Sequence, residues 1–297
     1  MSDTGPARKT PGETALLETP APDPALHAAP DSAPDPAVSI ASATGLSVTA
    51  VGVAVQEQPD YRPVAGLAAD DDLLPLVRAV ADLNDIPLDR LEMLTDSGDT
   101  KNVSAMALAA LGRPDRPQPL YYVRSGPLPD PYVATLARLV HEADWAGEDT
   151  GITHLDELGG TAVFDLLDWA VGEGPGATAL VCDEVLFADS RLGPVPAAAV
   201  ALRVRRGPGP LEVLAVGEGT PGAWPRNAAD HRFTGRRACD GWIALGRALA
   251  DGRIADGDRL LLHTRGEHRE GWLLLRAADT AGLELADAHN GPRSAGA

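Results

Sequence analysis

Short apolar runs alternate with segments of helical periodicity along most of this chain, and this alternation limits the folds that it can adopt. Spacing of two residues or unbroken apolar character indicates strands at residues 46–55, 120–123, 177–182, 197–204, 211–216, 260–263 and 272–275. Spacing of three to four residues indicates helices at residues 73–83, 104–111, 131–141, 159–171 and 239–250. Strands that alternate with helices are typical of one architecture. We therefore predict an α/β fold.

The two ends of the chain have a different composition from its middle. Residues 1–37 are rich in proline, alanine and acidic residues and contain no aromatic residue. Such a segment buries too little apolar surface to offset the entropy lost on ordering, so we expect a disordered tail. A docking tail for a partner is the alternative function of this segment. A shorter polar tail is expected at residues 279–297.

Charge and composition exclude several classes of function. The net charge of -18 repels phosphate backbones, so we expect no nucleic-acid partner. No stretch approaches the roughly 20 apolar residues of a membrane span, and the first residues lack the pattern of a secretion signal. We therefore expect a cytoplasmic protein with no membrane partner.

The metal-binding residue types do not occur at the spacing of a known site. The chain has two cysteines, which are too few for a disulfide framework or a zinc finger. His263 and His268 with Glu267 and Glu270 are the alternative candidates for metal ligands, but their spacing favours a solvated loop. No metal and no cofactor are expected.

Three segments together resemble one family of enzymes. Residues 156–164, with the sequence DELGGTAVF, are similar to the active-site turn and helix of 3-hydroxy-3-methylglutaryl-CoA synthase and ketoacyl-ACP synthase III. Residues 177–184, ATALVCDE, resemble the core strand that follows this helix. Residues 248–262, together with 272–276, resemble the last helix and pair of strands of ketoacyl-ACP synthase III.

The resemblance implies a thiolase-like fold, in which two related α/β halves pack together and two chains normally pair. It covers residues from about 40 to 277 with one large gap. We expect a complete first half at residues 38–205 and a reduced second half at residues 206–278.

The chain departs from the family at the positions that carry its chemistry. The family places a cysteine at the amino end of a buried helix, where the helix dipole and free N–H groups lower the pKa of the thiol. Glu157 occupies the matching position here. A carboxylate accepts an acyl group from a thioester far more poorly than a thiolate does.

The family's second-half residues are also missing. The resemblance places the family's asparagine near Gly235, and the segment that carries its histidine is absent; His231 lies outside the expected context. The glycine-rich loop near the end of the family's chain is replaced by the charged residues 266–270.

The two cysteines of the chain are the alternative candidates for a nucleophile. Cys182 lies within an apolar strand, which favours a buried structural role. Cys239 begins an expected helix, which can activate a thiol, but no histidine is fixed beside it by the sequence.

These departures leave two hypotheses of function open. The first is a non-condensing subunit of acyl, fatty-acid or polyketide biosynthesis that pairs with a full-length ketosynthase or with itself, and that contacts an acyl carrier protein or acyl-CoA. The second is an acyltransferase-family enzyme, a decarboxylase, hydrolase or transferase, that uses Glu157 as its catalytic residue in place of the cysteine. A truncated remnant that folds poorly is the remaining possibility.

Overall fold

The computed structural model describes residues 44–64, 74–83, 85–94, 102–125, 135–193 and 195–288. The expected tail at residues 1–37 lies outside the described residues. So do the first residues of the two helices expected at 73–83 and 131–141.

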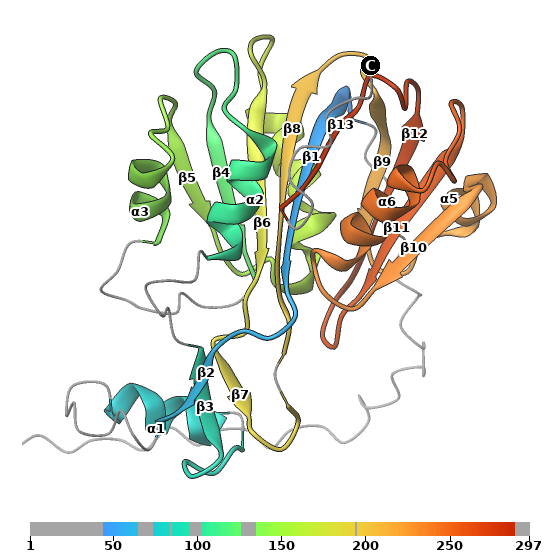
Figure 1. The fold of residues 1–297 in the computed structure, drawn as a ribbon. Coiled ribbons are helices and arrows are strands. Elements are labelled where there is room, and N and C mark those ends of the chain that lie inside the picture. Colours follow the sequence, from blue (N-terminus) through green and yellow to red (C-terminus); the bar gives the residue numbers. More distant parts are fainter. Residues whose placement is uncertain are drawn as a thin grey trace, which may run out of the picture. The chain divides into compact units, whose positions relative to one another are not determined.

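Five strands form the first half of a ten-stranded mixed sheet (Figure 1). In chain order they are β1 (Leu46–Gln56), β4 (Leu120–Arg124), β5 (Asp149–Ile152), β6 (Ala177–Asp183) and β8 (Ala197–Arg206). Their order across the sheet is β5-β4-β6-β8-β1. β4 runs parallel to β5 and β6, whereas β8 is antiparallel to both of its neighbours. Because β6 is covered on both faces, all of its residues are buried, which explains why most of them are apolar.

Four strands of the second half repeat this arrangement. In chain order they are β9 (Leu211–Glu218), β10 (His231–Gly235), β11 (Arg259–Arg265) and β12 (Glu270–Ala277), and their order across the sheet is β10-β11-β12-β9. β10 and β11 are parallel, and β12 is antiparallel to both of its neighbours. These strands match β4, β6, β8 and β1 in turn, and β5 has no counterpart. The second half is therefore the first half with its third strand missing.

A final strand lies where the two half-sheets diverge. β1 pairs with β9 only at Ser47 and Val48, and further along it pairs in parallel with β13 (Glu284–Asp287). The backbone N–H of Ala288 also donates to the carbonyl oxygen of Val53, at 2.9 Å. Backbone groups of β1 that β9 leaves unpaired thus find partners. The expectation of a polar tail from residue 279 was wrong for this strand, whose mostly exposed residues give no apolar signal.

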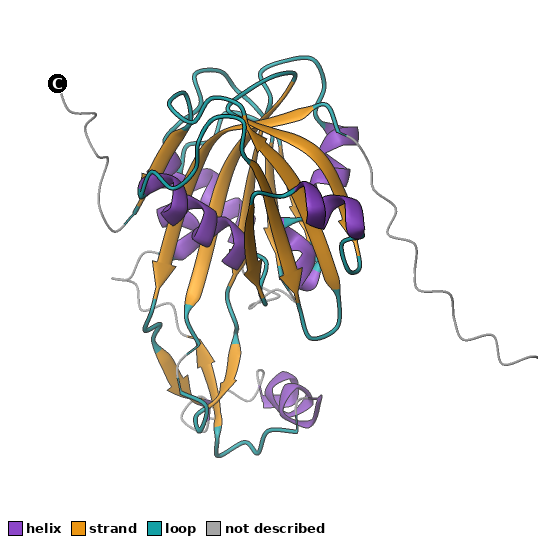
Figure 2. Ribbon diagram, turned by 90° about the vertical axis from the view of Figure 1, so that its right-hand side faces the viewer, coloured by secondary structure: helices purple, strands orange, loops and turns teal. Residues whose placement is uncertain are grey.

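Helices lie on both sides of the large sheet (Figure 2). One core is shared by α4 (Val163–Ala170), α6 (Asp240–Ala250) and strands of both halves. A second core packs α2 (Val103–Leu111) and α3 (Thr135–Glu142) against the first half, and α5 (Ala223–Ala228) contacts β11. None of the helices among the described residues is long and apolar enough to span a bilayer.

A small three-stranded sheet forms a separate cluster. It consists of β2 (Tyr61–Pro63), β3 (Leu91–Leu94) and β7 (Phe187–Asp189), and α1 (Leu74–Leu83) packs in the same apolar cluster. The sequence predicts α1 but none of these strands, because each is short and contains a charged residue, so none forms an unbroken apolar run.

Two further expectations were wrong in detail. The sequence predicts no helix or strand at residues 217–234, but these residues contain α5 and most of β10. β10 lies at the edge of the sheet, and only Phe233 of its five residues is buried, so its sequence looks polar. The helix expected at 159–171 begins at Val163, because residues 156–160 form a 3-10 turn.

Candidate functional site

Glu157, which the sequence resemblance aligns with the family's nucleophile, lies in the 3-10 turn η2 (Asp156–Gly160) before α4. The turn contains two adjacent glycines, which are poor helix formers. It also begins with Asp156 in the left-handed region, at φ 47°. Glu157 is therefore not a residue of a regular helix end, and its side chain leaves the turn toward the hairpin between β11 and β12.

The hairpin loop covers the carboxylate of Glu157. The backbone N–H of Glu267 donates to Glu157 Oε1 at 3.0 Å, and His268 Nδ1 lies 3.6 Å from the same oxygen. A Cβ added at Gly266 would overlap the Glu157 side chain, so the backbone of the loop packs directly on it. The side chain of Glu157 is only 18% exposed.

The hydrogen bonds of this loop decide the charge of Glu157. Burial raises the pKa of the carboxyl, but hydrogen bonds from backbone N–H groups, among them that of Glu267, and from His268 together outweigh burial. The net effect lowers the pKa below its ordinary value. Glu157 is therefore a charged carboxylate at neutral pH and a weak base.

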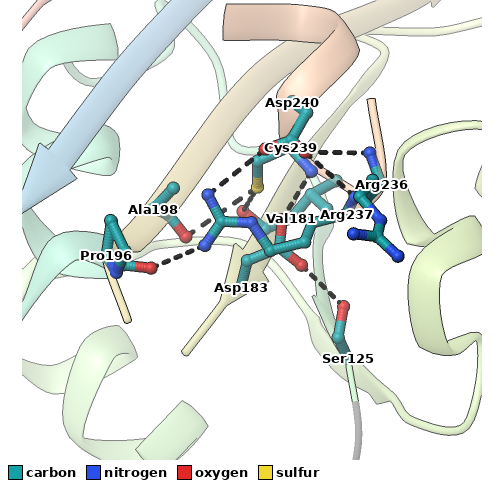
Figure 3. Close-up of polar contacts among 9 residues, drawn as sticks. All are labelled: Ser125, Val181, Asp183, Pro196, Ala198, Arg236, Arg237, Cys239 and Asp240. Carbon is teal, nitrogen blue, oxygen red and sulfur yellow. Dashed lines mark hydrogen bonds and ion pairs between the residues drawn. The ribbon is translucent and has the colours of Figure 1, made fainter. Parts of the chain in front are cut away.

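The segment that leads into α6 is the second part of the site, and three of its backbone N–H groups donate to carboxylates of the chain itself (Figure 3). The backbone N–H groups of Arg236 and Arg237 donate to Asp240 Oδ2 at 3.0 and 3.1 Å. The backbone N–H of Cys239 donates to Asp183 Oδ2 at 2.6 Å. Two carboxylates of the chain itself thus fill a helix end that otherwise attracts anions.

Ser125 connects this helix end to the turn of Glu157. Its Oγ lies 2.8 Å from Asp183 Oδ1 (Figure 3). The same oxygen lies 2.9 Å from the carbonyl oxygen of Asp156, so the hydroxyl can donate to either group. Burial raises the pKa of the Asp183 carboxyl above its ordinary value, against the opposing hydrogen bonds from Cys239 and Ser125.

Sequence reasoning missed Ser125, Asp183 and Asp240. Two signals were present: the acidic pair 183–184 directly after a wholly apolar strand, and Asp240 within the first turn of a helix. Neither signal identifies the partner groups, because Asp183 and Cys239 are 56 residues apart in the chain.

Neither cysteine is available as a nucleophile. Cys182 and Cys239 are both fully buried. Cys239 Sγ lies 3.4 Å from the carbonyl oxygen of Val181, and its place at the amino end of α6 does not activate it. Burial raises the pKa of both thiols well above the ordinary value, and neighbouring carboxylates raise it further.

Gly235, where the resemblance places the family's asparagine, and His231 lie at opposite ends of β10. A Cβ at Gly235 would overlap the side chain of Asp240, so that position has no room for an asparagine. His231, at the other end of β10, pairs with Asp258 at 3.0 Å. Four residues of extended chain separate His231 from Gly235, roughly 13 Å.

The two histidines predicted as candidate metal ligands contact different carboxylates. His263 is buried on β11 and lies 3.4 Å from Glu270. His268 lies in the exposed loop beside Glu157. Among the described residues, no group of three histidine, cysteine or acidic side chains is placed to hold a metal ion.

We expect the Asp183→Asn substitution to change how stability depends on pH. The raised pKa means that the folded chain holds this proton to a higher pH than the unfolded chain does. The contribution of protonated Asp183 to the free energy of unfolding is thus complete below the ordinary pKa of 3.8. It is lost as the pH rises through the raised pKa of the folded chain. The stability of the natural chain relative to the variant should therefore fall across this window, which urea unfolding between about pH 3 and about pH 7 will measure.

Asp256→Asn provides a control of opposite sign. The backbone N–H and hydroxyl of Thr280 lower the pKa of Asp256. Its contribution is present above the ordinary pKa and is lost as the pH falls, so this difference should grow as the pH rises. Equal pH profiles for the two variants would contradict the buried environment of Asp183.

Comparison with known proteins is informative only at the level of structure. No protein-family model matches the chain, and neither does any curated protein. The solved structure of ChlB3, described as an acyltransferase, matches with a TM-score of 0.51 and 15% identity, over 80% of this chain and 99% of that one. HMG-CoA synthase in complex with CoA matches with a TM-score of 0.52 and 8% identity, over 80% of this chain and 84% of that one.

These similarities agree with the paired halves of the sheet and with the resemblance in the sequence. Identities this low establish the fold and leave the activity open. The chain thus has a thiolase fold like that of ketoacyl-ACP synthase III, with a complete first half and a second half that lacks one strand.

Proposed function

We propose that this protein is a non-condensing subunit of an acyl-assembling enzyme, and that it pairs with an active ketosynthase. The observation that carries the proposal is the packing of the β11–β12 hairpin onto Glu157, because the hairpin covers the side chain that the sequence resemblance aligns with the family's nucleophile. The similar solved proteins are an acyltransferase and a CoA-bound synthase, which is consistent with a role near acyl thioesters.

Three further features support a loss of condensing chemistry. The thiols of Cys182 and Cys239 are fully buried in the core. The amino end of α6 is filled by Asp183 and Asp240. The position of the family's asparagine is closed by Asp240. Covalent transfer needs a nucleophile with an activating group beside it, and oxyanion stabilisation needs free donors; the described residues of this site offer neither.

The alternative hypothesis gives Glu157 a catalytic role. A general base that works near neutral pH needs a pKa close to that pH. The hydrogen bonds from the hairpin shift the pKa of Glu157 in the opposite direction. The direction of this pKa shift therefore disfavours a role for Glu157 as a general base.

The test is co-expression with each full-length ketosynthase of the same organism, followed by purification through a tag on one chain. We expect a stable complex at micromolar concentration whose condensing activity requires the cysteine of the ketosynthase. Intact-mass spectrometry after incubation with malonyl-CoA and acyl-CoA should find no acyl adduct on this chain. A protein that stays alone with every ketosynthase of its pathway contradicts the pairing.

Glu157→Gln separates the two hypotheses. Glutamine keeps the shape and one acceptor oxygen, so the complex and its activity should change less than about twofold, as expected for a group outside the reaction. A loss of about a hundredfold or more, or turnover of a thioester by the isolated chain that this variant abolishes, would establish Glu157 as a catalytic residue.

A further inference from the structure

The first half contains a buried guanidinium group with more than half of its hydrogen-bond donors unused. Arg124, the last residue of β4, is 1% exposed. Its Nη1 lies 3.4 Å from Glu184 Oε2 and 3.5 Å from the hydroxyl of Tyr122. Among the described residues, nothing accepts a hydrogen bond from its Nε or Nη2. Buried polar groups without partners are rare and indicate a missing acceptor.

The two unused nitrogens form one edge of the guanidinium. Nε–H and Nη2–H point in parallel, and together they match the two oxygens of a carboxylate. Glu184 contacts a different corner, at Nη1, and leaves this edge open. We propose that Arg124 anchors an internal binding site for the carboxylate group of a small organic acid.

The groups around Arg124 fit such a ligand. Ser104, in the first turn of α2, is buried beside Tyr122 and Cys182, and its hydroxyl makes no hydrogen bond of ordinary geometry. The amino end of a helix favours an anion. Tyr122 and Cys182 belong to the apolar core that α2 shares with β4 and β6, and apolar surroundings suit the hydrocarbon part of an acid.

Burial favours a small molecule over the side chain of a protein partner. Arg124, Ser104, Tyr122 and Cys182 are all buried, and a partner's side chain reaches only groups at the surface. The guanidinium fork favours a planar carboxylate over an uncharged acceptor, because hydrogen bonds between charged groups are roughly twice as strong as neutral ones. This site is separate from Glu157 and holds whether or not the chain pairs with a ketosynthase.

The test is calorimetric titration of the full chain, at constant ionic strength, with butyrate, octanoate, butyramide and inorganic phosphate. We expect one saturable site for the carboxylates and none for butyramide. Arg124→Lys keeps the charge but removes the fork, so it should weaken binding about tenfold or more. Arg203→Lys is the matched control: Arg203 Nη2 already donates to the carbonyl oxygens of Leu111 and Gly112, and its Nε is the one buried nitrogen of that side chain that lacks a partner among the described residues.

Several outcomes would overturn the site. These are no saturable binding of either acid, tighter binding of phosphate than of the acids, and equal weakening by Arg124→Lys and Arg203→Lys. A crystal structure of the natural chain grown with butyrate covers the case in which Arg124→Lys fails to fold. Butyrate on Nε and Nη2 would support the site, and a water molecule alone on that edge would refute it.

Discussion

Gly160→Ala should lower the free energy of unfolding by roughly 3 kcal/mol, the upper range for an added methyl group in a packed core. The new Cβ would overlap the carbonyl oxygen of Ala238 and lie 3.0 Å from its carbonyl carbon and 3.3 Å from Trp242 Cδ1. Ala238 belongs to the backbone that leads into α6, so relief of the clash requires the whole start of that helix to move. Urea unfolding followed by circular dichroism measures the loss.

Gly172→Ala is the matched control. Gly172 follows α4, and no heavy atom lies within 4 Å of a Cβ placed there. This change should alter stability by less than about 0.5 kcal/mol, as is usual for exposed positions. If both variants unfold at the same urea concentration, the close contact between the turn of Glu157 and the start of α6 is wrong.

Trp242→Ala should destabilise the chain by roughly 4 kcal/mol, within the range for truncation of a buried large aromatic side chain. Trp242 is 1% exposed on α6, and its ring stacks on Phe164 of α4 with 5.8 Å between ring centroids. Its Nε1–H donates to the carbonyl oxygen of Gly160 at 2.8 Å. The substitution leaves a cavity between the central helices and an unpaired buried oxygen.

Trp242→Phe and Trp169→Ala divide this effect into its parts. Phenylalanine keeps the stacked ring but leaves the Gly160 oxygen unpaired, so it should cost about 1 to 3 kcal/mol. Trp169, on the outer side of α4, is 89% exposed, and its truncation should change stability by less than about 0.5 kcal/mol. If Trp242→Ala and Trp169→Ala lower the free energy of unfolding equally, the assignment of the buried and exposed faces of α4 is wrong.

The sequence predicts those elements whose burial leaves a pattern in the residues themselves. β6 and most of β8 are buried on both faces, so their apolar runs are unbroken. β5 and β13 are largely exposed, and they form strands because a neighbour supplies hydrogen bonds. Pairing between distant segments leaves no local trace, and this is why the edge strands were missed.

The candidate site was predictable only in part, for the same reason. The motif around Gly159 locates Glu157, but the contact that determines its charge comes from Glu267, 110 residues later in the chain. Asp183 directly follows an apolar strand that the sequence predicts, but its partners, Ser125 and the backbone N–H of Cys239, are not evident from the sequence. Sequence patterns identify which residues are polar and buried, whereas the fold decides what they bond to.

The position of β1 in the sheet determines when, during synthesis of the chain, this strand can first pair with a neighbour. β1 is the first described strand that the ribosome makes, yet its three partners, β8, β9 and β13, begin at residues 197, 211 and 284. A nascent chain must therefore carry an unpaired, strongly apolar segment through most of its synthesis, a state that invites aggregation. Production of this protein should depend on chaperone supply and translation speed more than its final stability would suggest.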